Sequence, residues 1–122
     1  MKTLLIVLFI LSQSENLRCD EVVTCKELMD YVIQNGTRKA SVNQFQLIES
    51  SWLKDVTSYT IENTIVVIAE IKDEYGFNTK KYIFCGIPST NWDSFYYGYN
   101  DLDKTYGERF HKYIFNNKCN CQ

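Results

Sequence analysis

Near the beginning of the chain, apolar residues recur at a helical spacing. Leu28 and Val32 lie four positions apart, and Thr24 precedes them with Glu27 three residues later. A Thr followed by Glu at this distance is typical of a capping box at the start of a helix. Asn35-Gly36 interrupts the apolar stripe, so we expect the helix to end there.

The next stretch, residues 37–51, is mostly polar and predicts a loop, with a second short helix as the alternative. From Ser50 onward, Thr, Val and Tyr become frequent, which is typical of strands. The expected strands cover about 50–61, 64–71 and 79–87. Glu62-Asn63 and Tyr75-Gly76 have turn chemistry, so the three strands predict an antiparallel meander. The run 64–71 is apolar on both faces, which indicates a central strand.

A helical pattern returns after Gly86-Ile87-Pro88. Ser89 or Thr90 is the expected cap of a helix that Gly98 ends, and a last helix is expected over 106–115. The residues expected to face inward are Trp92, Phe95, Tyr96, Phe110, Tyr113 and Ile114. The predicted fold class is α+β, with an N-terminal helix, a three-stranded antiparallel β-meander and two C-terminal helices packed on the sheet.

The first 14 residues have the pattern of a secretory signal peptide. Lys2 precedes eight consecutive apolar residues, and a small-x-small sequence ends at Ser14. We therefore expect three segments: a signal peptide (1–14), an N-terminal helical extension (15–49) and a C-terminal domain with a cysteine-containing tail (50–122). The expected location is secreted or periplasmic. Membrane attachment is expected only if Cys19 is lipidated, and in a eukaryote Asn35-Gly36-Thr37 is a glycosylation acceptor.

Export makes disulfides the first hypothesis for the cysteines. The chain has five, of which Cys25, Cys85, Cys119 and Cys121 are the disulfide candidates. Cys119 and Cys121 are too close in the chain to prefer each other. Cys25 is therefore expected to pair with one of them and Cys85 with the other. The alternative is a zinc site built from Cys85, Cys119, Cys121 and His111, although the spacing is not that of paired Cys-x-x-Cys units.

The stretch from about residue 50 to 115 resembles the KTSC domain, a short module named after the C-terminus of some lysyl-tRNA synthetases. The matching features, in order, are Ser50-Ser51, Tyr59, the strand 64–71, Tyr82-Ile83-Phe84 before Gly86-Ile87-Pro88, Trp92, Phe95, the run 106–110 and Ile114. The chain departs from the family pattern by a loop inserted around 100–104 and by Tyr106 where Ser is usual. The resemblance implies a β-meander followed by helices, and nucleic-acid binding has been suggested for such modules.

Composition and charge narrow the functional classes. A hydrophobic fraction of 45% supports a folded core, and the net charge of −2 argues against a protein held on nucleic acid mainly by phosphate contacts. The candidate basic patches are Lys80-Lys81 and the set Arg109, Lys112 and Lys118. There is no Gly-rich phosphate loop, no His-Glu-x-x-His and no Gly-x-Ser-x-Gly motif.

Two groups of polar residues are candidates for catalysis or metal binding. A hydrolase would pair His111 with Glu108 and use Cys85 or Ser51 as the nucleophile. Asp101 and Asp103 beside Asn100 are carboxylates of the kind that calcium binds, without the rest of a binding loop.

The aromatic cluster after Ser89 supplies the ligand-binding candidates, which are Tyr97, Tyr99 and Trp92. Core packing is the main expectation for Trp92. The sequence therefore predicts a small exported binding or interaction protein with no enzymatic activity and no cofactor, whose partner is an unidentified protein or small ligand. The alternatives are a nucleic-acid-binding module and a small hydrolase using His111.

Overall fold

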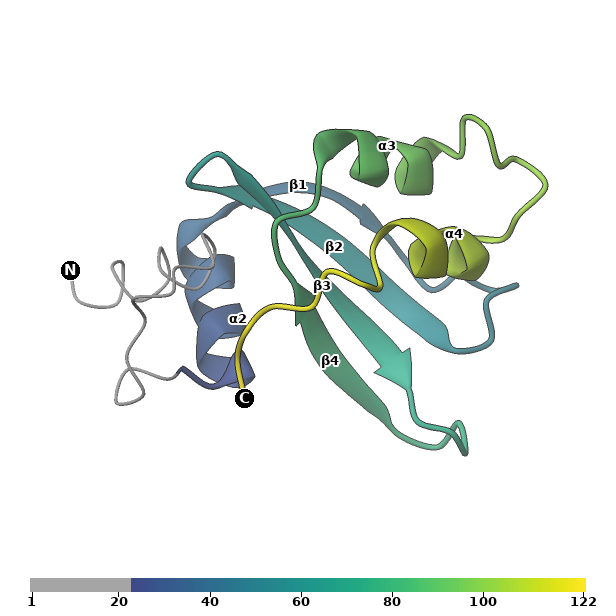
Figure 1. Ribbon diagram of the computed structural model, residues 1–122. Helices are drawn as coiled ribbons and strands as arrows, with labels where there is room; N and C mark the ends of the chain where they lie inside the picture. The colour runs from purple at the N-terminus through teal and green to yellow at the C-terminus, as the bar shows by residue number, and fades with distance from the viewer. Residues whose placement is uncertain (1–22) are drawn as a thin grey trace.

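Four antiparallel strands form a sheet in the order β1-β2-β3-β4, and helices cover both of its faces (Figure 1). The computed structural model describes residues 23–122. Its elements are α2 (Cys25–Asn35), β1 (Thr37–Val42), β2 (Leu53–Ile61), β3 (Thr64–Lys72), β4 (Thr79–Phe84), α3 (Ser89–Tyr97) and α4 (Tyr106–Tyr113). The α+β class, the N-terminal helix and the two C-terminal helices are confirmed.

The meander forms where the sequence predicts it. Glu62 and Asn63 have φ values of 53° and 62° and connect β2 to β3 as a two-residue hairpin turn. Left-handed backbone at both positions matches the right-handed twist of the flanking strands. β3 lies between β2 and β4, and its residues 65–69 are buried, as expected for a central strand.

The sheet has four strands, so the prediction of three is wrong. The additional strand is β1, which pairs antiparallel with β2 in a stretch predicted to be a loop. β1 is an edge strand in which only Val42 is buried, and its register shifts between Arg38 and Ala40. An edge strand with one buried side chain and a bulge lacks the alternation from which strands are recognised. The stretch 37–42 therefore belongs to the same sheet as the C-terminal part of the chain.

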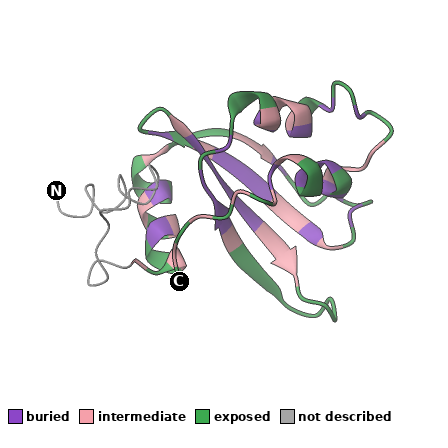
Figure 2. Ribbon diagram, in the orientation of Figure 1, coloured by how far each residue is buried: buried purple, intermediate pink, exposed green. Residues whose placement is uncertain are grey.

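Two hydrophobic cores lie on opposite faces of the sheet, because side chains alternate along each strand. Figure 2 shows buried residues on the central strands and on the helix surfaces that pack against them. The core beneath α3 and α4 contains Val42, Leu47, Leu53, Val56, Ile65, Val67, Ala69, Phe84, Ile87, Trp92, Phe95, Phe110 and Ile114. The core beneath α2 contains Leu28, Val32, Ile61, Val66, Ile68, Ile83 and Cys85.

The helix ends follow local chemistry with two differences from expectation. The Thr24–Glu27 capping box of α2 is confirmed, and α4 has an equivalent box formed by Thr105 and Glu108. The expected Ser89 or Thr90 cap of α3 is wrong, because Pro88 occupies the N-cap position and provides no side-chain hydrogen bond. α4 ends at Tyr113, two residues before the expected end.

Candidate binding groove

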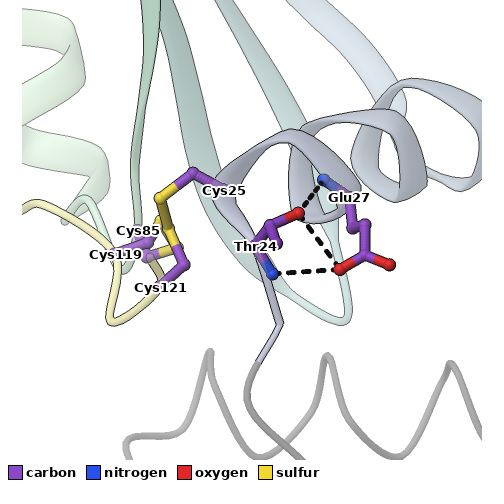
Figure 3. Close-up of a disulfide and its surroundings, with 6 residues drawn as sticks. All are labelled: Thr24, Cys25, Glu27, Cys85, Cys119 and Cys121. Carbon is purple, nitrogen blue, oxygen red and sulfur yellow. Dashed lines mark hydrogen bonds between the residues drawn. A yellow bond between two sulfur atoms is a disulfide. The ribbon is translucent and has the colours of Figure 1, made fainter.

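Two disulfides connect the C-terminal tail to the rest of the protein (Figure 3). Cys25 pairs with Cys121 and Cys85 with Cys119, with Cα–Cα distances of 5.1 and 4.9 Å. Both distances lie in the range that disulfide geometry requires. The four disulfide candidates are confirmed, and of the two pairings left open the structure has Cys25 with Cys121. Disulfides are compatible with an oxidising extracellular or periplasmic compartment.

The same pairing removes the thiols that the zinc alternative needs. Cys85, Cys119 and Cys121 all have their sulfur atoms in disulfides. Within residues 23–122, no group of three or more His, Cys, Asp or Glu side chains is arranged to hold a metal ion.

The tail runs along β4 and then crosses to α2. The Cys85 amide donates to the Asn117 carbonyl at 2.8 Å, and the Cys119 amide donates to the Ile83 carbonyl at 3.2 Å. Beyond Cys119 the tail leaves β4, and the Gln122 carbonyl accepts a hydrogen bond of 2.8 Å from the Cys25 amide. That amide belongs to the first turn of α2, where backbone donors have no partner within the helix.

A hollow of about 680 Å³ lies between α2, β4 and the tail. It is larger than the hollows beside Phe45 and Ile48, about 280 Å³, and beside Trp52 and His111, about 370 Å³. We call it the α2–β4 groove, and it is lined by Thr24, Cys25, Lys26, Met29, Asp30, Ile33, Lys80, Lys81, Tyr82, Ile83, Lys118, Cys119, Cys121 and Gln122. Ile33 is 48% exposed, which leaves apolar surface of α2 open beside the strand.

Lysines dominate the charge of the α2–β4 groove. Lys26 forms an exposed ion pair with Asp30 at 3.2 Å, whereas no carboxylate within residues 23–122 pairs with Lys80, Lys81 or Lys118. The ammonium groups of Lys80 and Lys118 both lie near the Tyr82 ring, 5.4 and 5.8 Å from its centroid. Favourable cation–π contacts hold these two charges at the edge of β4.

Only part of the second predicted basic set reaches this surface. Lys118 joins Lys80 and Lys81, whereas Lys112 forms an ion pair with Asp101 at 3.2 Å. Arg109 is buried, so its assignment to a surface patch is wrong. Its guanidinium donates to the carbonyls of Phe95 and Lys104 at 2.9 and 2.8 Å and lies over the Tyr106 ring.

The three predicted ligand-binding aromatics separate into two places. Tyr97 and Tyr99 are 54% and 65% exposed, and their rings stack with centroids 5.2 Å apart. Trp92 is 1% exposed and packs against Phe95 and Tyr96 in the core beneath α3. The tyrosine pair lies at the C-terminal end of α3 and therefore belongs to the opposite side of the sheet from α2.

The proposed hydrolase residues meet at one hollow without forming a catalytic arrangement. Ser51, Glu108 and His111 line the 370 Å³ hollow beside Trp52. The Glu108 carboxylate accepts a hydrogen bond of 2.9 Å from the Thr105 amide, and the His111 ring stacks on Phe115. Within residues 23–122, no hydrogen bond connects His111 to Ser51 or Glu108, and Cys85 is in a disulfide.

Asp101 is one of the two carboxylates considered for calcium, and its oxygens already have partners within the protein. It is 5% exposed, and its carboxylate accepts hydrogen bonds from the Tyr113 hydroxyl and the Lys112 ammonium. The Tyr113 hydrogen bond, together with Lys112, lowers the pKa of Asp101 below its ordinary value, against the opposing effect of burial. Asp103 is exposed.

Comparison of the chain with protein-family models, with curated proteins and with solved structures found no significant match. The resemblance to the KTSC domain stays a prediction. The expected signal peptide (1–14) and Cys19 lie outside the described residues. Asn35 is exposed at the end of α2. None of the helices in residues 23–122 has the length and apolar character needed to cross a bilayer.

Sequence reasoning missed the α2–β4 groove as a site. Its residues come from segments near both ends of the chain and from β4, and they meet only through the sheet and the disulfides. One signal is present in the sequence, because Lys80-Lys81 and Lys118 belong to its two candidate basic patches. Nothing in the spacing of these lysines indicates that they share one surface.

Proposed function

We propose that this chain is an exported binding protein without enzymatic activity, and that its ligand occupies the α2–β4 groove. The observation that carries the proposal is the construction of the groove. Its walls are α2, the edge of β4 and a tail that two disulfides connect to both. Apolar pockets with a few placed charges are the usual form of ligand sites in proteins.

The disulfides also support the expected secretion. Their survival requires an oxidising environment, which agrees with the leader predicted over residues 1–14. Expression of the full chain in a secreting host, followed by intact mass measurement, tests this part. We expect loss of the leader, and on reduction an increase equal to four hydrogen atoms from the two disulfides. A retained N-terminus with reduced thiols would contradict export.

An apolar anion is the matched probe for the groove. We expect 8-anilinonaphthalene-1-sulfonate to bind with increased fluorescence and to shift the amide resonances of Met29, Ile33 and Ile83. Ile33→Glu places a carboxylate in the groove and should weaken binding. Ile48→Glu is the control, because Ile48 is 79% exposed and belongs to the loop between β1 and β2.

Two results would reject the groove as the binding site. One is an equal loss of probe affinity in Ile33→Glu and Ile48→Glu. The other is a set of resonance shifts confined to Tyr97 and Tyr99, which would place binding on the tyrosine pair instead.

A further inference from the structure

We infer that the natural occupant of the α2–β4 groove is an extended acidic peptide segment that adds to β4 as a fifth strand. This inference rests on the proposed function and names the class of ligand for the same groove. Strand addition to an exposed sheet edge is a general mode of peptide recognition, in which backbone hydrogen bonds give affinity and side-chain pockets give specificity.

The direction of the backbone groups in β4 shows which part of its edge is open. The tail bonds to the Cys85 amide and the Ile83 carbonyl, so odd-numbered residues of β4 direct their backbone groups away from β3. In an antiparallel pair this direction alternates along the strand. The backbone groups of Thr79 and Lys81 therefore point outward, and neither residue has a backbone partner on that side within residues 23–122. Both residues are exposed, whereas Ile83 is 3% exposed and already lies opposite Cys119 of the tail.

The edge stays open because the tail turns away from it. The Cys121 amide donates to the carbonyl of Cys119 at 3.1 Å instead of continuing the pairing with β4. The Cys25–Cys121 disulfide then holds this part of the tail against the start of α2. Figure 3 shows the two disulfides side by side at this point. The disulfide thus ends one strand pairing and leaves room for another.

The side chains along the edge define the chemistry of the peptide. On the α2 face of β4, Lys81 and Ile83 line the groove together with Met29 and Ile33 of α2. On the other face, Lys80 and Lys118 flank Tyr82. Because side chains of a strand alternate between faces, a peptide with alternating apolar and acidic residues places the apolar ones toward Met29 and Ile33 and the acidic ones toward Lys80 and Lys118. Of the charged residues that line the groove, four are lysines and one is an aspartate.

The other edge of the sheet lacks these features. β1 has a register shift between Arg38 and Ala40, and irregularities of this kind discourage further strand pairing. Lys39 and Arg38 are nevertheless adjacent cations on an edge strand, as Lys80 and Lys81 are. The two edges therefore provide a matched experiment.

The probe is a capped synthetic peptide of about eight residues in which Glu and Val alternate. Three variants of the peptide serve as comparisons: one with Lys in place of Glu, one with alternate backbone amides methylated, and one with both changes. Binding to the disulfide-bonded protein is measured by calorimetry and by amide hydrogen exchange. We expect the acidic peptide to bind and each single change to weaken binding about tenfold or more.

Hydrogen exchange provides the signature of strand addition. The amides of Thr79 and Lys81 should become protected when the peptide binds, because they gain acceptors. The amides of Lys80 and Tyr82 already face β3 and should change little. The double variant Lys80→Glu/Lys81→Glu should lose about tenfold or more in affinity, whereas Arg38→Glu/Lys39→Glu should bind as the parent protein does.

The outcomes separate this inference from the proposed function. If the acidic, basic and methylated peptides all bind equally in the groove, the strand-addition inference is overturned and the groove remains a binding site. Loss of affinity in Arg38→Glu/Lys39→Glu alone would also overturn it, by placing the peptide on β1. If neither the peptides nor the sulfonate probe shifts groove resonances, both proposals fail.

Discussion

The two sides of the sheet are covered by different means. The core beneath α3 and α4 has thirteen buried residues, and four of them are the large aromatics Phe84, Trp92, Phe95 and Phe110. The core beneath α2 has seven, none of them aromatic. One of the seven is Cys85, and the other three disulfide cysteines pack against this core. Burial of large rings gives the first side most of its free energy of folding. On the second side, covalent links supplement a small core.

The different means of covering the two sides explain why the groove lies on the α2 side. A helix that depends on packing alone must cover its sheet face closely, because each lost van der Waals contact reduces the stability of the fold. α2 is tied through Cys25 to a tail that is itself tied to β4 through Cys85–Cys119. It can therefore leave the edge of β4 and its own Ile33 exposed without losing its position.

The largest expected effect comes from the aromatic core. The Phe110 ring is fully buried and packs edge-on against Trp52, Phe84 and Phe95. Phe110→Ala should lower the free energy of unfolding by about 3–5 kcal/mol, which approaches the whole stability of a small domain. Urea denaturation followed by near-UV circular dichroism measures this loss.

Leu28→Ala on the α2 side is the matched variant. It should cost less, about 2–3 kcal/mol, because fewer rings lose contacts and the disulfide still holds α2. A larger loss for Leu28→Ala than for Phe110→Ala would mean that the α2 side dominates the stability, against the comparison made above.

Removal of each disulfide tests the covalent side directly. In the chain-entropy description, the stabilisation grows with the length of the closed loop, and the two separations are 96 and 34 residues. Cys25→Ser/Cys121→Ser should therefore cost about 4–5 kcal/mol, and Cys85→Ser/Cys119→Ser about 1 kcal/mol less. Thermal and urea unfolding of the two variants give the values.

The two disulfide variants should also differ in binding. Loss of Cys25–Cys121 frees the part of the tail that closes one end of the α2–β4 groove, so affinity for the acidic peptide should fall. The amide resonances of Tyr97 and Tyr99, which lie on the other side of the sheet, should be unchanged in both variants. Equal peptide affinity with and without Cys25–Cys121 would show that the groove does not depend on this disulfide.

A smaller, pH-dependent effect on stability is expected at Asp101, on the side of the sheet that α3 and α4 cover. The hydrogen bond from Tyr113, with Lys112, lowers the pKa of Asp101 in the folded protein. A carboxyl with a lowered pKa stabilises the fold at pH values above its unfolded pKa, which is about 3.9. That stabilisation is lost as the pH falls through the lower, folded-state pKa.

Asp101→Asn should therefore reduce the free energy of unfolding at neutral pH. The difference from the parent protein should shrink below about pH 4 and vanish in stronger acid. Urea denaturation between about pH 2 and 7 gives the profile. A difference that stays constant with pH would show that the charge of Asp101 does not contribute.

The smallest effects are expected at the two capping boxes, one on each side of the sheet. Thr24 and Thr105 each accept a hydrogen bond from the amide of a Glu three residues later, at 3.0 and 3.1 Å. Substitution of a cap by Ala costs about 1 kcal/mol. Thr24→Ala should cost less than Thr105→Ala, because the Cys25 disulfide limits fraying of α2. Amide exchange at Glu27 and Glu108 compares the two helix ends.

The sequence by itself determined those features that depend on neighbouring residues. The Thr24–Glu27 cap, the left-handed turn at Glu62-Asn63 and the apolar run of β3 are local, so their chemistry can be recognised along the chain. The set of paired cysteines was also predictable, since Cys119 and Cys121 could not join each other.

Tertiary structure alone decided the features that depend on distant contacts. β1 forms because β2 offers it backbone partners, and Arg109 is buried because the Phe95 and Lys104 carbonyls accept its hydrogen bonds. The choice of Cys121 as the partner of Cys25, 96 residues away, follows from the path of the tail across β4. The candidate groove depends on that same path, because the lysines that line it meet only after the chain has folded.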